Sequence, residues 1–212
     1  MWQSLKRKIL NRSAYFTSYV KLIPILKNID KSSLFIDCGA NVGDISSLFL
    51  SRGAKVIAFE PDLLAFSRLQ KRFSGGQRIE LINKAVADSD GKAMFYYHKE
   101  RLKSEGVEFT VSSSLLREKI NVDGEHGIEV EIVDLCKYID DLGRKVDILK
   151  MDIEGEEIAV LNKMISEETY KRVGLILVET HETKIPGHRE KVAALKRRIQ
   201  EEGITNIKLN WI

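Results

Sequence analysis

The sequence has few cysteines, little net charge and no long apolar run. Its two cysteines, Cys38 and Cys136, stand in apolar stretches without the spacing of a disulfide or a metal site, so we expect a reducing compartment and no zinc. The 34 lysines and arginines and 31 aspartates and glutamates leave a formal charge of +3, too small to argue for a nucleic-acid partner. Neither a secretory signal pattern nor an apolar run of transmembrane length is visible, so the expected location is the cytoplasm.

The rest of the composition is that of a globular protein. With 212 residues and 43% hydrophobic content, the chain can bury a substantial core. We expect two parts, a leader over residues 1–30 and a single folded domain over residues 31–212.

The leader combines apolar residues at helical spacing with basic residues between them. Such a basic amphipathic helix can contact a membrane surface weakly, here through residues 1–28, or cap a substrate. The favoured interpretation is an extra helix packed on the domain. Pro24 is expected to break or kink it.

Residues 34–43 hold the feature around which the domain is organised. The apolar run from Leu34 ends in Asp37, Gly39 and Gly43 follow four positions apart, and a helix-compatible sequence begins at Asp44. This order predicts a strand, a tight loop and a helix. Loops at the carboxyl ends of strands in open α/β sheets form the usual ligand crevice. The full G-x-G-x-x-G fingerprint is missing, which favours a ligand other than a pyrophosphate.

Apolar runs alternate with helix-compatible segments along the chain. The first half reads β-α-β-α-β, which implies a parallel sheet with right-handed crossovers. A long polar segment then separates two strands that resemble an inserted antiparallel pair. The expected strands are 34–36, 55–59, 79–82, the inserted 93–97 and 128–133, and then 146–151, 174–178 and 206–211; the expected helices include 44–52, 63–73, 134–142 and 189–202.

Polar side chains recur where the predicted strands end. They are Asp37, Glu60, Asn83 with Lys84, Asp152 with Glu154, and Glu179 with His181. Because parallel strands end at the same edge of a sheet, five such groups predict one site. Glu60 lies where a carboxylate can accept hydrogen bonds from both hydroxyls of a ribose, and Asp37 would suit the ammonium of an amino-acid moiety. Together these features indicate S-adenosylmethionine as the cofactor.

An alcohol that accepts a methyl group must lose its proton. His181 is the candidate general base, since an imidazole can accept a proton at neutral pH. Asp152 and Glu154 compete with it, either as the base or as groups that orient His181 and the acceptor. Asp152, Glu154, Glu179 and His181 could instead hold a divalent metal; the favoured interpretation has no metal.

Six motifs in a fixed order carry a family resemblance. They are FIDCGANVGD, AFEPD, NKAVAD-x-D-G, SSSLL, DILKMDIEGEE and VETH. Over about residues 34–181 the chain resembles the FkbM-type branch of class I S-adenosylmethionine-dependent methyltransferases. The resemblance implies an α/β fold with a Rossmann-like, mostly parallel sheet, helices on both faces and a reversed final strand. It also implies O-methylation of hydroxyls on sugars, lipids or polyketide-like metabolites.

The resemblance also assigns cofactor residues. It places the glycine loop around the methionine moiety, Glu60 on the ribose, and the segment from Asn83 to Asp88 beside the adenine. The expected cofactor-binding set is Asp37, Gly39, Ala40, Asn41, Gly43, Glu60, Pro61, Asp62, Asn83 and Ala85.

The sequence therefore predicts a methyltransferase whose acceptor is a small molecule or a glycan, with no nucleic-acid partner. One alternative is a nicotinamide-dependent Rossmann-fold oxidoreductase, against which the incomplete glycine fingerprint argues. Another is a catalytically silent domain that binds nucleosides or partner surfaces. The serines at 112–114 could bind a ligand or belong to a plain loop.

Overall fold

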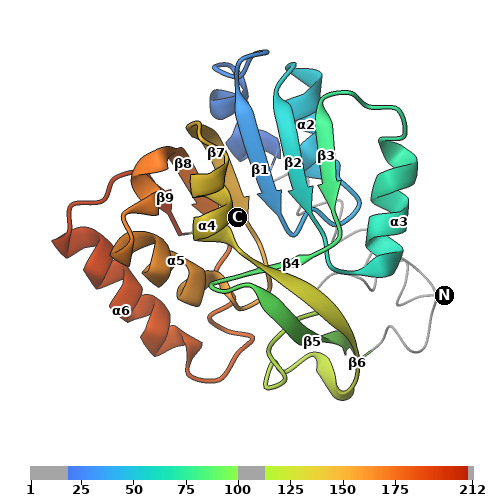
Figure 1. Ribbon diagram of the computed structural model, residues 1–212. Coiled ribbons are helices and arrows are strands. Elements are labelled where there is room, and N and C mark those ends of the chain that lie inside the picture. The colour runs from blue at the N-terminus through green and yellow to red at the C-terminus, as the bar shows by residue number, and fades with distance from the viewer. Residues whose placement is uncertain (1–18, 100–112, 210–212) are drawn as a thin grey trace.

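The computed structural model describes residues 19–99 and 113–209 (Figure 1). It begins with a helix over residues 19–26. The elements that follow are β1 (Leu34–Cys38), α2 (Asp44–Ser51), β2 (Lys55–Phe59), α3 (Leu63–Arg72), β3 (Ile79–Ile82), β4 (Ala85–Ala87), β5 (Gly91–His98), β6 (Val122–Asp134), α4 (Leu135–Asp141), β7 (Val146–Met151), α5 (Glu157–Ser166), the 3-10 helix η3 (Thr169–Arg172), β8 (Val173–Val178), α6 (His188–Glu201) and β9 (Ile207–Lys208).

Six strands form one parallel sheet in the order β3-β2-β1-β7-β8-β9. The chain builds outward from β1 to β3 and then returns to the other side of β1 with β7. The order of the strands therefore reverses between β1 and β7. In open α/β sheets, ligands bind outside the carboxyl ends of the strands at such a switch point, so the topology alone locates the candidate site.

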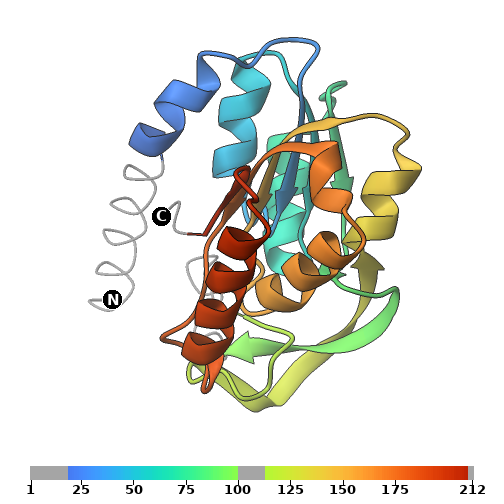
Figure 2. The same ribbon diagram turned by 90° about the vertical axis from the view of Figure 1, so that its left-hand side faces the viewer.

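Helices cover both faces of this sheet, as expected. Alternate residues of β1 point to opposite faces: Ile36 packs in a cluster with α4, α5 and α6, and Phe35 packs in a cluster with α2, α3 and the helix over residues 19–26. The rings of Phe35 and Phe49 stack with their centroids 3.7 Å apart. Figure 2 shows the helix over residues 19–26 and α2 on one side of the strands, and α4 and α5 on the other.

The expected insert is also present. β5 and β6 pair antiparallel, and β4 adds to β6 in parallel, so these three strands form a separate small sheet. It lies below the carboxyl ends of the main strands in Figure 1. The insert therefore stands beside the edge at which the switch point lies.

The direction of the last strand corrects one expectation. β9 pairs in parallel with β8, whereas the resemblance implied a reversed final strand. The reason is that α6 crosses back over the sheet and returns the chain to the edge at which the strands begin. Residues 210–212, where the expected strand over 206–211 would continue, lie outside the described residues.

The end of the leader packs on the domain. Leu22 and Leu26 are buried in the cluster beneath α2. Of the expected break or kink at Pro24, the break is absent: Pro24 lies within the helix over residues 19–26 and does not end it. Residues 1–18, on which most of the membrane-surface hypothesis rests, lie outside the described part of the chain. Across residues 19–99 and 113–209, each helix is too short or too polar to cross a bilayer.

Candidate active site

The floor of the candidate site is a buried ion pair between β1 and β7. Asp37 is fully buried, with Oδ1 3.2 Å from Nζ of Lys150. Its Oδ2 accepts a hydrogen bond from Oγ of Ser46 (2.7 Å), and Lys150 Nζ donates to the carbonyl oxygen of Gly39 (2.8 Å). Burial alone would lower the pKa of Lys150, but Asp37 and then Asp152 raise it above its ordinary value, so the lysine is charged. Asp37 supports the glycine loop from beneath.

The glycine loop is held by the backbone of the neighbouring strands. The N–H groups of Gly39 and Ala40 both donate to the carbonyl oxygen of Phe59 (3.0 and 2.9 Å). Gly39 has a φ of +77°, and a Cβ there would stand 1.9 Å from the carbonyl oxygen of Asp152. Gly43, at the N-cap of α2, has a φ of +81°. Both glycines are needed because a left-handed backbone and a close approach coincide.

Glu60 closes the loop from the end of β2. Its Oε2 accepts from the N–H of Asn41 (2.7 Å) and its Oε1 from the N–H of Asp62 (2.8 Å). Burial raises the pKa of Glu60 to about 8, against the opposing effect of the Asn41 N–H. Asn83 donates to the carbonyl oxygens of Glu60 and Pro61, and Asp62 is a buried cap for the first turn of α3. Asn83 and Asp62 thus fix the turn that presents Glu60.

A pocket of about 590 Å³ opens above these groups. From the expected cofactor set it is lined by Gly39, Asn41, Glu60, Pro61 and Ala85, and from the expected catalytic set by Asp152 and Glu154. Asp37, Ala40, Gly43, Asp62, Asn83 and His181 do not line it. The further lining residues are Phe59, Lys84, Val86, Phe95, Ser113, Leu115 and Ile153.

The insert supplies a wall of the pocket that the strand-end argument missed. Phe95 comes from β5, and Ser113 and Leu115 come from the segment that pairs with it through the bridge between Tyr96 and Ser114. In the sequence, the serines at 112–114 were the one indication of this wall, although their pattern did not distinguish a ligand-binding segment from a plain loop. Ser112 lies outside the described residues.

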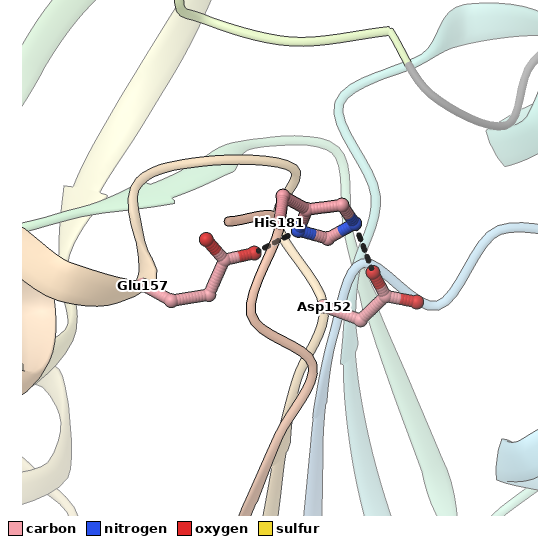
Figure 3. Close-up of side chains that lie close together, drawn as sticks. All are labelled: Asp152, Glu157 and His181. Carbon is pink, nitrogen blue, oxygen red and sulfur yellow. Dashed lines mark hydrogen bonds and ion pairs between the residues drawn. The ribbon is translucent and has the colours of Figure 1, made fainter. Parts of the chain in front are cut away.

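Four carboxylates surround His181 at the ends of β7 and β8. Nδ1 of its ring lies 3.0 Å from Oε1 of Glu157, while Nε2 lies 3.0 Å from Glu154, 3.6 Å from Asp152 and 3.8 Å from Glu179. Figure 3 shows the ring between Glu157 on one side and Asp152 on the other. The His181 side chain is 1% exposed. Glu157 closes the motif DILKMDIEGEE but was not among the expected site residues, because it begins α5 and looks like an ordinary first-turn acid.

The setting of His181 favours the protonated form of its ring. Burial would lower the pKa of His181, but the hydrogen bonds and charges of Glu154 and Glu157 raise it to about 10. At neutral pH the ring is therefore an imidazolium, which has no free lone pair to accept a proton. What the arrangement offers instead is a fixed positive charge that holds the carboxylates in place.

Glu157 ties this histidine to the loop that follows β7. Its two oxygens accept from the backbone N–H groups of Ile153 (3.0 Å) and Gly155 (2.9 Å), in addition to the contact with His181. A buried carboxylate with these donors is fully engaged. Glu157 is thus a structural link between the D-I-E-G loop and the end of β8.

Glu154 is held by the insert. Nζ of Lys119, whose side chain is fully buried, forms an ion pair with Oε2 of Glu154, and Oγ of Ser114 donates to the Glu154 carbonyl oxygen (2.7 Å). Glu154 has a φ of +61°, a left-handed backbone that is uncommon for a residue with a side chain. Burial would raise the pKa of Glu154, but His181 and Lys119 hold it below its ordinary value. The carboxylate is therefore ionised and already paired.

Two carboxylates at this edge are less engaged. Asp152 is 26% exposed and has only long ion-pair contacts, 3.6 Å to Lys150 and 3.6 Å to His181. Burial and the charge of Asp152 raise the pKa of Glu179 to about 7.

Among described residues, Asp152, Glu157 and His181 also offer atoms within 4.8 Å of one another that could bind a metal. Because both ring nitrogens face carboxylates, a metal would have to replace a proton of His181.

Comparison with known proteins gives matches over most of the chain. Residues 37–203 match the methyltransferase FkbM domain family. Methyltransferase sdnD of Sordaria araneosa is 26% identical over 220 residues, covering 88% of this chain and 80% of sdnD. The 2-O-methyltransferase NoeI of Sinorhizobium fredii (strain NBRC 101917 / NGR234) is 24% identical over 152 residues, covering 66% of this chain and 60% of NoeI.

A solved structure from Clostridium thermocellum, described as a candidate rRNA-methylase, matches with a TM-score of 0.48 and 12% identity, over 91% of this chain and 81% of that chain.

Proposed function

We propose, on the premise that this chain belongs to the methyltransferase FkbM domain family, that it transfers a methyl group from S-adenosylmethionine to a hydroxyl of a sugar, lipid or secondary-metabolite acceptor. The observation that supports this proposal most is the single pocket that joins the glycine loop and Glu60 to the carboxylates of Asp152 and Glu154. The relative NoeI is named a 2-O-methyltransferase, which favours oxygen as the methylated atom. The activity is assigned to residues 31–212, with residues 1–30 as a leader.

The residues of the pocket fit S-adenosylmethionine. Each oxygen of Glu60 accepts one backbone N–H and retains a lone pair for a ribose hydroxyl. Gly39 leaves room for close approach, and the ionised carboxylate of Glu154 suits a cation. S-adenosylmethionine supplies an electrophilic methyl group on a positively charged sulfonium. Of the ten expected cofactor residues, the five that line the pocket would contact it, and Asp37, Ala40, Gly43, Asp62 and Asn83 would hold those five in place.

Asp152 is the proposed proton acceptor. It lines the pocket, and its ion-pair contacts are long, whereas Glu154 is engaged by Lys119 and His181. The role of His181 is to position these carboxylates as an imidazolium. Positioning of the two reactants supplies much of the acceleration in a displacement of this kind, so the protein needs to add little besides a carboxylate that receives the proton.

Glu60→Gln is expected to weaken binding of S-adenosylmethionine roughly tenfold, because an acceptor oxygen is replaced by a donor and one hydrogen bond of about 1.5 kcal/mol is lost. Isothermal titration calorimetry with the cofactor and with its demethylated product measures this. The matched control is Glu129→Gln, at an exposed ion pair with Lys92 on the insert, which should bind as the wild type does. Wild-type protein that binds neither ligand, or that binds a nicotinamide dinucleotide instead, would contradict the proposal.

Asp152→Asn is expected to lower the rate of methyl transfer about 100-fold, the contribution of a general base, and to change cofactor affinity little. The acceptor is first identified by incubating the protein with labelled methyl donor and a lysate of its own source, followed by analysis of the labelled product. Rates for the wild type, Asp152→Asn and the surface control Asp90→Asn are then compared. An unchanged rate in Asp152→Asn would rule out Asp152 as the base.

A further inference from the structure

Exposed cations gather at the edge of the sheet opposite the candidate active site. The amino ends of β1, β2 and β3 lie at the top of Figure 1, away from the insert. We call the exposed cations of this region the basic edge; they are Lys27, Lys31, Arg52, Lys55, Arg78, Arg144 and Lys145. They come from four separate segments of the chain, residues 27–31, 52–55, 78 and 144–145, so no charge run in the sequence reveals them.

Hydrogen bonds bring these segments together around the turn at residues 31–33. Arg78 donates from Nη2 to the carbonyl oxygen of Lys31 and from Nε to that of Gly53 (2.7 Å). Arg144 donates from Nη2 to the carbonyl oxygen of Ser32 (2.8 Å). A guanidinium bonded to carbonyl groups keeps its full charge, because these acceptors are neutral. These bonds hold the segments of Lys31, Gly53, Arg78 and Arg144 close together.

Few carboxylates offset this charge in the described part of the chain. Asp30 accepts hydrogen bonds from Ser32, and Asp147 accepts from the backbone of Leu34 and lies 3.9 Å from Arg144. Cations farther along the same edge are paired, Lys171 with Glu168 and Arg172 with Asp140. The seven cations of the basic edge thus outnumber the two carboxylates of Asp30 and Asp147, while the acids of the candidate active site lie at the other end of the strands.

Exposed aliphatic side chains stand on the adjoining helix over residues 19–26. Val20 is 47% exposed and Ile23 is 39% exposed, although both are apolar. Their spacing from Lys27 puts all three on one face, turned away from the face that buries Leu22 and Leu26. Apolar side chains next to cations on one helix face are typical of helices that lie in a membrane interface.

We propose that the basic edge, with Val20 and Ile23, binds the surface of an anionic phospholipid bilayer. Each lysine or arginine close to such a surface contributes about 1 kcal/mol, so seven together support reversible binding without a membrane-spanning helix. A nucleic acid fits less well, because the large exposed apolar side chains of the described residues are aliphatic or Met, with no aromatic ring for bases to stack on. The candidate active site would then face away from the lipid. The proposal does not depend on the reaction that the site performs.

Co-sedimentation of the full chain with lipid vesicles tests this proposal. Binding is expected to vesicles of phosphatidylcholine mixed with phosphatidylglycerol, to fall with added salt, and to be absent with phosphatidylcholine alone. A variant with Lys27→Gln, Lys31→Gln, Lys55→Gln and Lys145→Gln should bind the anionic vesicles about 100-fold less or weaker still. The matched control carries Lys92→Gln, Lys137→Gln, Lys191→Gln and Lys196→Gln, which remove the same charge elsewhere, and should retain most of the binding.

Ile23→Ser should reduce vesicle binding without changing the net charge. All of these substitutions are at exposed positions, and thermal melts should confirm that the variants fold. Equal binding by the quadruple variant and the wild type would overturn the proposal and assign the affinity to the basic residues of the first 18 positions. Binding to duplex or single-stranded nucleic acid that is tighter than binding to vesicles, and is lost in the same variant, would also overturn it.

Discussion

Gly39→Ala is expected to destabilise the protein by about 3 kcal/mol or more and to abolish binding of the methyl donor. A methyl group at this position would stand 1.9 Å from the carbonyl oxygen of Asp152, and neither backbone can move without breaking the pairing of β1 with β7. Overpacking against a rigid backbone and a φ of +77° both add to the cost. Urea denaturation followed by circular dichroism measures the stability, and calorimetry measures the binding.

The control for this substitution is Gly143→Ala. Gly143 has a φ of +62°, close to that of Gly39, but a Cβ there would meet no atom within 4 Å. It should therefore cost only the left-handed backbone penalty, about 1 kcal/mol, and leave binding intact. If the two substitutions destabilised the protein equally, the close approach between the glycine loop and Asp152 would have no energetic importance.

Lys119→Met is expected to lower the free energy of unfolding by about 3 kcal/mol, because it removes one of the two cations that pair with the mostly buried carboxylate of Glu154, the other being His181. The Lys119 side chain is fully buried and that of Glu154 is 17% exposed. Met preserves most of the side-chain volume, so a cavity contributes little. The loss should appear as a lower midpoint of urea unfolding with an unchanged m-value.

A double-mutant cycle isolates the pair. Glu154→Gln removes the other charge, and the double variant Lys119→Met/Glu154→Gln should be more stable than the sum of the two single losses predicts, by about 2 kcal/mol. The comparison pair is Lys92 and Glu129, whose side chains are 65% and 60% exposed. Its coupling should be below about 1 kcal/mol. Simple additivity at Lys119 and Glu154 would mean that the insert does not hold the D-I-E-G loop through this ion pair.

The positions of the glycine loop and the strands could be predicted from the sequence because they depend on local patterns of residue types. Continuous apolar runs fix a strand that is buried on both faces, and the glycine spacing fixes the turn that follows it. Since parallel strands end at one edge, the convergence of Glu60 and Asp152 followed from the same patterns. Their places on the wall of one pocket agree with that reasoning. The six ordered motifs likewise indicated the family that the comparisons confirm.

The sequence did not show which groups the polar side chains contact. Asp37 was expected to face the ammonium group of the cofactor's amino-acid moiety. Its carboxylate is instead buried against the side chain of Lys150, more than a hundred residues away in the chain. Lys119 stands in a polar segment with no motif, and only the docking of the insert brings it to Glu154. The seven cations of the basic edge come from four segments that only the fold brings together.

The sequence by itself determined the class of sheet, the position of the glycine loop and the family, since each depends on the order and spacing of residue types along the chain. The tertiary structure alone decided which charges meet. His181 shows why: the sequence pattern made it a candidate base, but the hydrogen bonds and charges of Glu154 and Glu157 outweigh the effect of burial and raise its pKa to about 10. Electrostatic energies depend on distance and solvent exposure, and neither is encoded locally.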